Sequence, residues 1–99
     1  MTKEIRASHI LCSMENSTKE DALTSIKKVQ KKLENGVKFS ELAEEFSDCP
    51  SGSRGGDLGC FGQGVMVDEF DKVAFSLKDN EVSEIVETEF GYHLIQRTG

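Results

Sequence analysis

The sequence contains only two histidines, His9 and His93, and they lie near opposite ends of the chain. Each lies in a segment that alternates like a β-strand, in line with aliphatic side chains. A neutral imidazole donates a hydrogen bond from one ring nitrogen and accepts one at the other, so two adjacent imidazoles can hold one another in fixed tautomers. If the two segments pair antiparallel at the middle of a sheet, the histidines form one polar site. On its own, His9 is equally well explained as a buried residue satisfied by one or two hydrogen bonds.

Other reactive side chains can join this pair. Cys49 and Thr88 are the polar neighbours that we expect to complete the network. A cysteine with a histidine also fits a thiol hydrolase, but the surrounding residues match no such motif, so we expect no covalent step. Metal binding by both histidines and the three cysteines is a weaker hypothesis, because their spacing resembles no ligand pattern. We therefore expect neither a metal nor another cofactor.

The segment from Phe46 to Phe70 holds six of the nine glycines, at positions 52, 55, 56, 59, 62 and 64. Only glycine takes positive φ without steric cost, so this segment must turn sharply and admit close neighbours. A solvated linker is the less favoured alternative, because apolar residues recur along it. We expect a loop that serves a site. Its apolar residues are Leu58, Cys60, Phe61, Val65, Met66 and Val67.

Periodicity predicts the elements that position these residues. Alternation over residues 4–12 predicts a strand on which His9 shares a face with the aliphatic side chains. Ser17 or Thr18 can cap a following helix, which carries an apolar stripe and ends at Asn35-Gly36. A shorter amphipathic helix is predicted over residues 39–47.

The second half of the chain is predicted in the same way. Residues 57–62 are predicted to form a short strand broken by glycine. Asp68, with Asp71 three places on, is expected to cap a third helix that closes at residues 78–80. Residues 82–88 and 92–97 are strand-like, and the second is expected to be central because both its faces are partly apolar. This order predicts an α+β domain with one sheet and helices packed over it.

The overall composition limits the class of protein. The 99 residues, 36% hydrophobic and 30% charged, predict a single soluble domain over residues 1–99. A formal net charge of −6 argues against wholesale nucleic-acid binding. An odd number of cysteines without CxxC spacing indicates neither a disulfide framework nor a standard zinc site, so we expect a reducing cytoplasm. Residues 1–11 lack the features of a signal peptide, although a domain cut from a longer exported protein would look the same.

Four lysines are expected on the exposed side of the first helix. A solvated helix face is the favoured interpretation, and contact with a membrane or an acidic partner is the alternative. These residues are Lys27, Lys28, Lys31 and Lys32.

Five segments together resemble the parvulin-type peptidyl-prolyl cis/trans isomerases, in particular the small free-standing bacterial kind. They span nearly the whole chain in the family's order: ASHIL, FSELAEEFS, CPSGSRGGDLGCFGQGVMV, DEFDKVAFSL and EVSEIVETEFGYHLI. The resemblance implies a four-stranded, mostly antiparallel sheet wrapped by about four helices, a superfold shared with FKBP. It also implies a site on the concave face of that sheet.

The resemblance assigns roles by position. It places four residues in the catalytic polar network, namely His9, Cys49, Thr88 and His93. It places Leu58, Met66 and Phe70 in the pocket for the substrate's proline ring, with Phe61 nearby. Independently, leucine, methionine and phenylalanine offer an adaptable apolar cup for a compact ring. Phe70 also fits the apolar stripe of the third helix, so a plain core role stays open.

The implied activity is acceleration of rotation about X-Pro bonds in peptides and folding polypeptides, without a covalent step and by a monomer. A non-catalytic, chaperone-like module that binds extended proline-containing segments is the alternative. Members of the family that prefer phosphoserine or phosphothreonine carry basic residues after the first strand, where residues 13–17 of this chain are SMENS. Arg54 is the single remaining candidate for pairing with a phosphate. We therefore expect broad use of unphosphorylated substrates.

Overall fold

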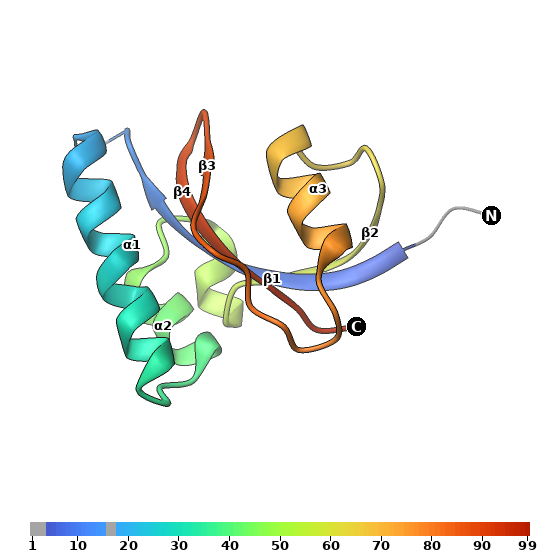
Figure 1. Cartoon of the computed structure of the whole chain (residues 1–99), viewed down its shortest axis with the longest axis horizontal. Coiled ribbons are helices and arrows are strands. Elements are labelled where there is room, and N and C mark those ends of the chain that lie inside the picture. The colour runs from blue at the N-terminus through green and yellow to red at the C-terminus, as the bar shows by residue number, and fades with distance from the viewer. Residues whose placement is uncertain (1–3, 16–17) are drawn as a thin grey trace.

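The computed structural model describes residues 4–15 and 18–99 (Figure 1). One sheet is built from β1 (Glu4–Ser13), β2 (Asp57–Gly62), β3 (Val86–Thr88) and β4 (Gly91–Arg97). Its strand order is β2-β1-β4-β3, and every neighbouring pair is antiparallel. The two strands that carry the histidines are therefore central, as the apolar residues on both faces of 92–97 predicted.

Three α-helices and one short 3-10 helix cover this sheet, which confirms the predicted α+β fold. They are α1 (Lys19–Glu34), α2 (Phe39–Phe46), η1 (Pro50–Arg54) and α3 (Asp68–Ser76). Thr18 caps α1 as predicted, because its hydroxyl accepts the N–H of Asp21 at 3.1 Å. Ser17, the alternative cap, lies outside the described residues.

The predicted N-cap of α3 was wrong. Asp68 is the first residue of α3 and not its cap, because the extended residue is Val67, and no side chain caps this helix. The Asp71 carboxylate instead lies 3.4 Å from the amide nitrogen of Gly64. Both carboxylates still lie in the first turn, where they suit the helix dipole.

The strand predicted over residues 82–88 is shorter than expected, since the continuous part of β3 begins at Val86 and residue 82 forms only an isolated bridge. The hydroxyl of Ser83 explains the break. It accepts the N–H of Ile95 at 3.0 Å in place of a backbone carbonyl, so the regular ladder is interrupted.

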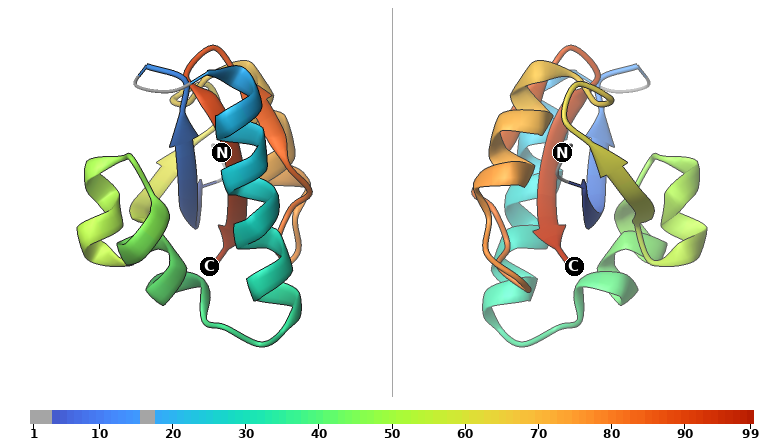
Figure 2. Two further views of the ribbon diagram at one scale, coloured as in Figure 1. Left: turned by 90° about the vertical axis from the view of Figure 1, so that its left-hand side faces the viewer. Right: turned by 90° about the vertical axis from the view of Figure 1, so that its right-hand side faces the viewer.

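Alternation along β1 supplies the two faces of the sheet. Ile10 and Cys12 face α1 and α2, whereas Ile5 and Ala7 face α3. Figure 1 shows the sheet between α1 and α3, and Figure 2 shows the same arrangement from both sides. The chain thus builds a core on each face of the same two central strands.

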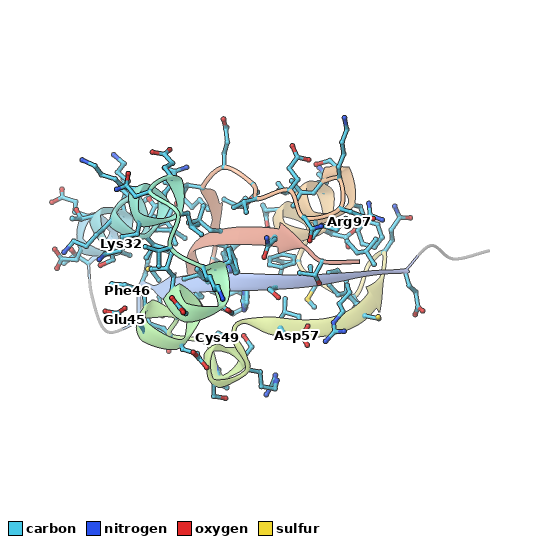
Figure 3. All side chains as sticks on the ribbon, turned by 90° about the horizontal axis from the view of Figure 1, so that it is seen from below. Lys32, Glu45, Phe46, Cys49, Asp57 and Arg97 are labelled. Carbon is cyan, nitrogen blue, oxygen red and sulfur yellow. The ribbon has the colours of Figure 1, made fainter. Side chains whose placement is uncertain are left out.

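The lysine-rich side of α1 faces outward, as predicted for Lys27, Lys28 and Lys31, which are exposed. Lys32 is partly buried, and its ammonium lies 5.9 Å from the centre of the Phe46 ring (Figure 3). None of the helices in the described ranges is both long and apolar enough to cross a bilayer.

Candidate active site

The two histidines meet on the face of the sheet covered by α3. The register of the central pair places His9 opposite Ile95 and Leu11 opposite His93, so the histidines are diagonal neighbours on one face. Their Nδ1 atoms are 3.1 Å apart, and their rings are stacked with centroids 5.3 Å apart. The side-by-side arrangement expected from antiparallel pairing is present.

Thr88 extends this pair into a chain of hydrogen bonds. Its Oγ1 lies 2.8 Å from His93 Nε2 and accepts the N–H of Phe90 at 3.2 Å. Because one Nδ1 must donate to the other, the two imidazoles hold different tautomers. His9 Nε2 is buried and has no hydrogen-bond partner within residues 4–15 and 18–99. The hydrogen-bonded series Thr88–His93–His9 therefore ends at a nitrogen of His9 that has no partner among the described residues.

Burial sets the charge of both rings. Burial, with a smaller contribution from the neighbouring His93, lowers the pKa of His9 to about 4. Burial alone lowers the pKa of His93 to about 4 as well. Both imidazoles are therefore neutral near pH 7, and the site offers polar atoms without a net charge.

A cavity of about 330 Å³ lies against the imidazoles. Its volume is near the lower end of the range for ligand pockets, about 300–1,000 Å³. Apart from the two imidazoles and a thiol its walls are aliphatic and aromatic, formed by His9, Leu11, Cys49, Leu58, Met66, Val67, Phe70, Phe90 and His93. Such a cavity accepts a small apolar ring better than a polar or charged group.

Phe70, from the first turn of α3, joins the apolar wall to the histidines. Its ring meets His9 and His93 edge-on, at centroid distances of 5.6 and 5.7 Å. Phe61 packs behind it at 6.2 Å and is itself buried. Phe61 does not line the cavity, so it supports the ring of Phe70 from behind.

A loop fixes Cys49 at the edge of the cavity. Because β2 pairs only with Glu4–Ser8, the edge of β1 near Leu11 is left for residues 47–48. Asp48 N–H donates to the Leu11 carbonyl at 2.8 Å, and Leu11 N–H donates to the Ser47 hydroxyl at 3.1 Å. The position of Cys49 is labelled in Figure 3.

The thiol of Cys49 does not join the imidazoles by a hydrogen bond. It accepts one from the Ser51 hydroxyl at 3.2 Å, and no imidazole bonds it within the described ranges. The expected polar network is thus completed through Thr88, whereas Cys49 contributes to the wall of the cavity.

Gly56 holds the loop against β1. Its carbonyl accepts the N–H of His9 at 2.9 Å, and its φ is +85°. A Cβ at this position would overlap the carbonyl oxygen of His9, so a side chain there would push the strand and loop apart. The close approach that the glycine-rich segment predicted therefore occurs directly beside a histidine of the site.

Comparison with known proteins identifies the family. The family model described as "Rotamase: PPIC-type PPIASE domain" matches residues 9–99. The chain belongs to the PPIC-type, or parvulin-type, peptidyl-prolyl isomerase family. The resemblance identified from the five sequence segments is thereby confirmed.

Individual parvulin relatives agree with this assignment. The chain is 50% identical over 96 residues to the foldase protein PrsA of Geobacillus kaustophilus, covering 96% of this chain and 31% of PrsA. It is 38% identical over 114 residues to the peptidyl-prolyl isomerase Pin1 of Malus domestica, covering 97% of this chain and 94% of Pin1. The solved structure of the isomerase ESS1 from Candida albicans matches with a TM-score of 0.88 and 39% identity, over 97% of this chain and 63% of that one. The chain thus spans about a third of PrsA and nearly all of Pin1.

Three residues that line the parvulin cavity were not assigned to it from the sequence, namely Leu11, Val67 and Phe90. Leu11 carried a usable signal, because it alternates onto the same face as His9. Val67 is the last residue of the apolar run that contains Met66. Phe90 lies in the turn between β3 and β4, and nothing in the local pattern indicates that this turn reaches the cavity.

Two further sequence-based hypotheses bear on the site. Arg54 does not line the parvulin cavity and lies instead at a different cavity of the molecule. Within the part of the chain that the structure describes, no group of three or more histidine, cysteine, aspartate or glutamate side chains is arranged to hold a metal ion.

Proposed function

We propose that this parvulin domain catalyses rotation about X-Pro bonds by non-covalent stabilisation of the twisted amide, acting on unphosphorylated segments of peptides and folding polypeptides. One observation carries the proposal: Leu58, Met66 and Phe70 share a single cavity with both neutral imidazoles. The apolar side chains grip the pyrrolidine ring, while the polar atoms face the bond that must rotate. The foldase named among the relatives supports folding polypeptides as one class of substrate.

The energy required is within reach of such a site. Rotation about the peptide bond has a barrier of about 18–20 kcal/mol, which comes from amide resonance. Uncatalysed prolyl isomerisation takes roughly tens to hundreds of seconds. Raising its rate about ten-thousandfold requires about 5–6 kcal/mol of preferential binding to the twisted amide. No bond has to break, so no nucleophile is needed.

The imidazoles suit this task because they are neutral and preorganised. Twisting removes the resonance between the carbonyl and the proline nitrogen, so the polarity of the amide changes as it rotates. Neutral groups held by Thr88 and by each other can respond to that change without the cost of placing a charge in an apolar cavity. We assign His9, His93 and Thr88 to this role.

Nucleophilic catalysis by Cys49 is disfavoured by the geometry. An attacking thiol needs a base within hydrogen-bond reach, whereas the hydrogen-bond partner of this thiol is the hydroxyl of Ser51. We assign Cys49 to the shape of the cavity.

The proposed activity is tested by a proline-isomerisation assay on a short Xaa-Pro peptide. Met66 is only partly buried, so Met66→Ala should leave the protein folded and lower kcat/KM at least tenfold through loss of contact with the ring. Val65→Ala is the matched control, because Val65 is 67% exposed and does not line the cavity. A wild-type protein without measurable acceleration, or equal activities for the two variants, would contradict the proposal.

The phosphate-independent specificity needs its own measurement. Among the residues that the structure describes, no lysine or arginine lines the cavity, so none of them offers an ion pair to a phosphate on the residue before proline. Kinetics on matched peptides with serine or phosphoserine before proline should therefore differ by less than about threefold. A large preference for the phosphorylated peptide would overturn this part of the proposal.

A chaperone-like binding module is the second candidate, and the exposure of Phe90 favours it. This side chain is 48% exposed although it lines the cavity, so it extends the apolar surface beyond the space for one ring. Binding of an extended peptide without faster isomerisation would select this candidate over catalysis.

We also propose that the domain works as a monomer in a reducing compartment such as the cytoplasm. One chain supplies the whole cavity, and all three cysteines are free thiols, with Cys60 exposed. We expect the lysine face of α1 to remain in water. Sedimentation of the purified protein tests whether it is a monomer. Detection of the protein in fractionated cells tests its compartment.

A further inference from the structure

A second cavity, of about 600 Å³, lies on the opposite face of the sheet from the imidazoles. Ser8 lines it, and Ser8 immediately precedes His9 in β1, so the two side chains point to opposite faces. The start of α2 and the loop before β2 close its sides. Its charged and hydroxyl-bearing residues are Arg6, Ser8, Lys38, Ser40, Arg54 and Asp57.

Two of its cations form no ion pair within the described ranges, although the charge of Arg54 also helps to lower the pKa of Asp57. Arg6 forms a two-point ion pair with Asp57, at 2.6 and 3.2 Å, and this contact is the main reason why the pKa of Asp57 falls to about 2. These two charges cancel. Lys38 and Arg54 have neither a hydrogen bond nor an ion pair from their side chains within the described ranges. The cavity therefore carries two surplus positive charges in a chain whose formal net charge is −6.

The floor of the cavity also has hydrogen-bonding groups. Ser8 is only 7% exposed, but it lines the open cavity, and no hydrogen bond from its hydroxyl is found among residues 4–15 and 18–99. A hydroxyl at the wall of a cavity can exchange a water for an oxygen of a ligand. Lys38, the N-cap residue of α2, makes no side-chain cap hydrogen bond within the described ranges, and the cavity is lined by Lys38, Phe39 and Ser40, so the start of this helix lies at its wall.

We propose that this cavity binds a phosphate monoester in its dianionic form. Two surplus cations match two negative charges, and an arginine fork, a lysine, a hydroxyl and a helix N-terminus are all donors that phosphate oxygens accept. A small phosphorylated molecule and a phosphorylated side chain of another protein share this chemistry. The site is separate from the proline cavity and does not depend on the isomerase mechanism.

The test is an amide-resolved NMR titration with inorganic phosphate at pH 7.5 and constant ionic strength. Binding should produce saturable shifts at Ser8, Ser40 and Gly55. Lys38→Gln and Arg54→Gln should each weaken binding at least fivefold, whereas Lys28→Gln, an equal change of charge on the exposed side of α1, should not. Acetate, with one negative charge, should bind at least tenfold more weakly than phosphate.

The spectra themselves show whether each variant is folded, and the isomerase activity of all three should be unchanged. A proline-free phosphoserine peptide identifies the source of the phosphate. Binding at least tenfold tighter than that of inorganic phosphate indicates a phosphorylated protein, and equal binding indicates a small molecule. Shifts that do not saturate, that appear only around His93, or that weaken equally in Lys28→Gln would overturn the proposal.

Discussion

The two faces of the sheet use alternate residues of the same central strands, yet they are covered differently. On one face, the 16-residue α1 and the 8-residue α2 enclose aliphatic side chains such as Ile10, Ile26 and Leu94, each fully buried. On the other, the 9-residue α3 covers only part of the sheet, and a cavity with two histidines remains beside it.

The face under α1 and α2 therefore contributes mainly to stability, and the face under α3 contributes the residues of the site. Where α1 and α2 cover it, the first face holds tightly packed side chains, which favours stability, and the cavity lined by Ser8 lies beside this packed part. A face covered by one short helix leaves space for a ligand and tolerates polar residues that bond one another. The comparison predicts that substitutions on the two faces have different consequences.

The largest combined effect is expected for Phe70→Ala. Phe70 is 3% exposed and contacts both imidazoles, so its loss should cost about 3–5 kcal/mol of stability and most of kcat/KM. Urea denaturation and the isomerisation assay measure the two effects. If activity per folded molecule survived, Phe70 would be a core residue only.

Ile26→Ala should affect stability alone. Ile26 is fully buried between α1 and the other face of the sheet, so the cavity left behind should cost about 2–5 kcal/mol. Because the imidazoles lie across the sheet, kcat/KM per folded molecule should stay within about twofold. A much larger loss of activity in fully folded protein would show that the faces are coupled.

Acidification should act through the α3 face. The two histidines have folded-state pKa values of about 4 and an ordinary value of 6.5, so the unfolded chain binds more protons between these pH values. Their contribution to stability is therefore complete above about pH 6.5 and is lost as the pH falls toward 4, with a slope of at most about 1.4 kcal/mol per pH unit for each histidine.

Denaturation curves across this pH range measure the slope, and His9→Phe should roughly halve it. The lowered pKa of Asp57, about 2, acts only below this window. A slope unchanged by His9→Phe would mean that His9 does not titrate between the two states.

The smallest effect is expected for Cys49→Ala. If the thiol only shapes the cavity, activity should fall by less than about tenfold while the fold is retained. A loss of a thousandfold or more in folded protein would instead indicate a covalent role for Cys49.

Much of the fold followed from local patterns. Alternation predicted β1, and the partly apolar faces of residues 92–97 predicted the central position of β4. β2 was predicted as a short strand broken by glycine, and helical periodicity predicted α1, α2 and α3 within a few residues. The errors occurred where side chains replaced backbone partners, as Ser83 does before β3, or where one extended residue moved a helix start, as at Val67. Such events depend on neighbours that a local pattern does not contain.

At the site, strand periodicity was enough to show which residues share a face, because the side-chain period of a strand is built into the backbone. His9 and Leu11 therefore had to lie on one face of β1, whereas the shared pocket of Met66 and Phe70 was implied only by the family resemblance. Three contacts could be seen only in the folded molecule. The Nδ1 atoms of His9 and His93 are 3.1 Å apart, the Cys49 thiol bonds Ser51 instead of an imidazole, and Arg54 lies at the cavity lined by Ser8. The physical reason is that these contacts join distant parts of the chain, and their geometry is set by strand register and loop closure rather than by any local preference.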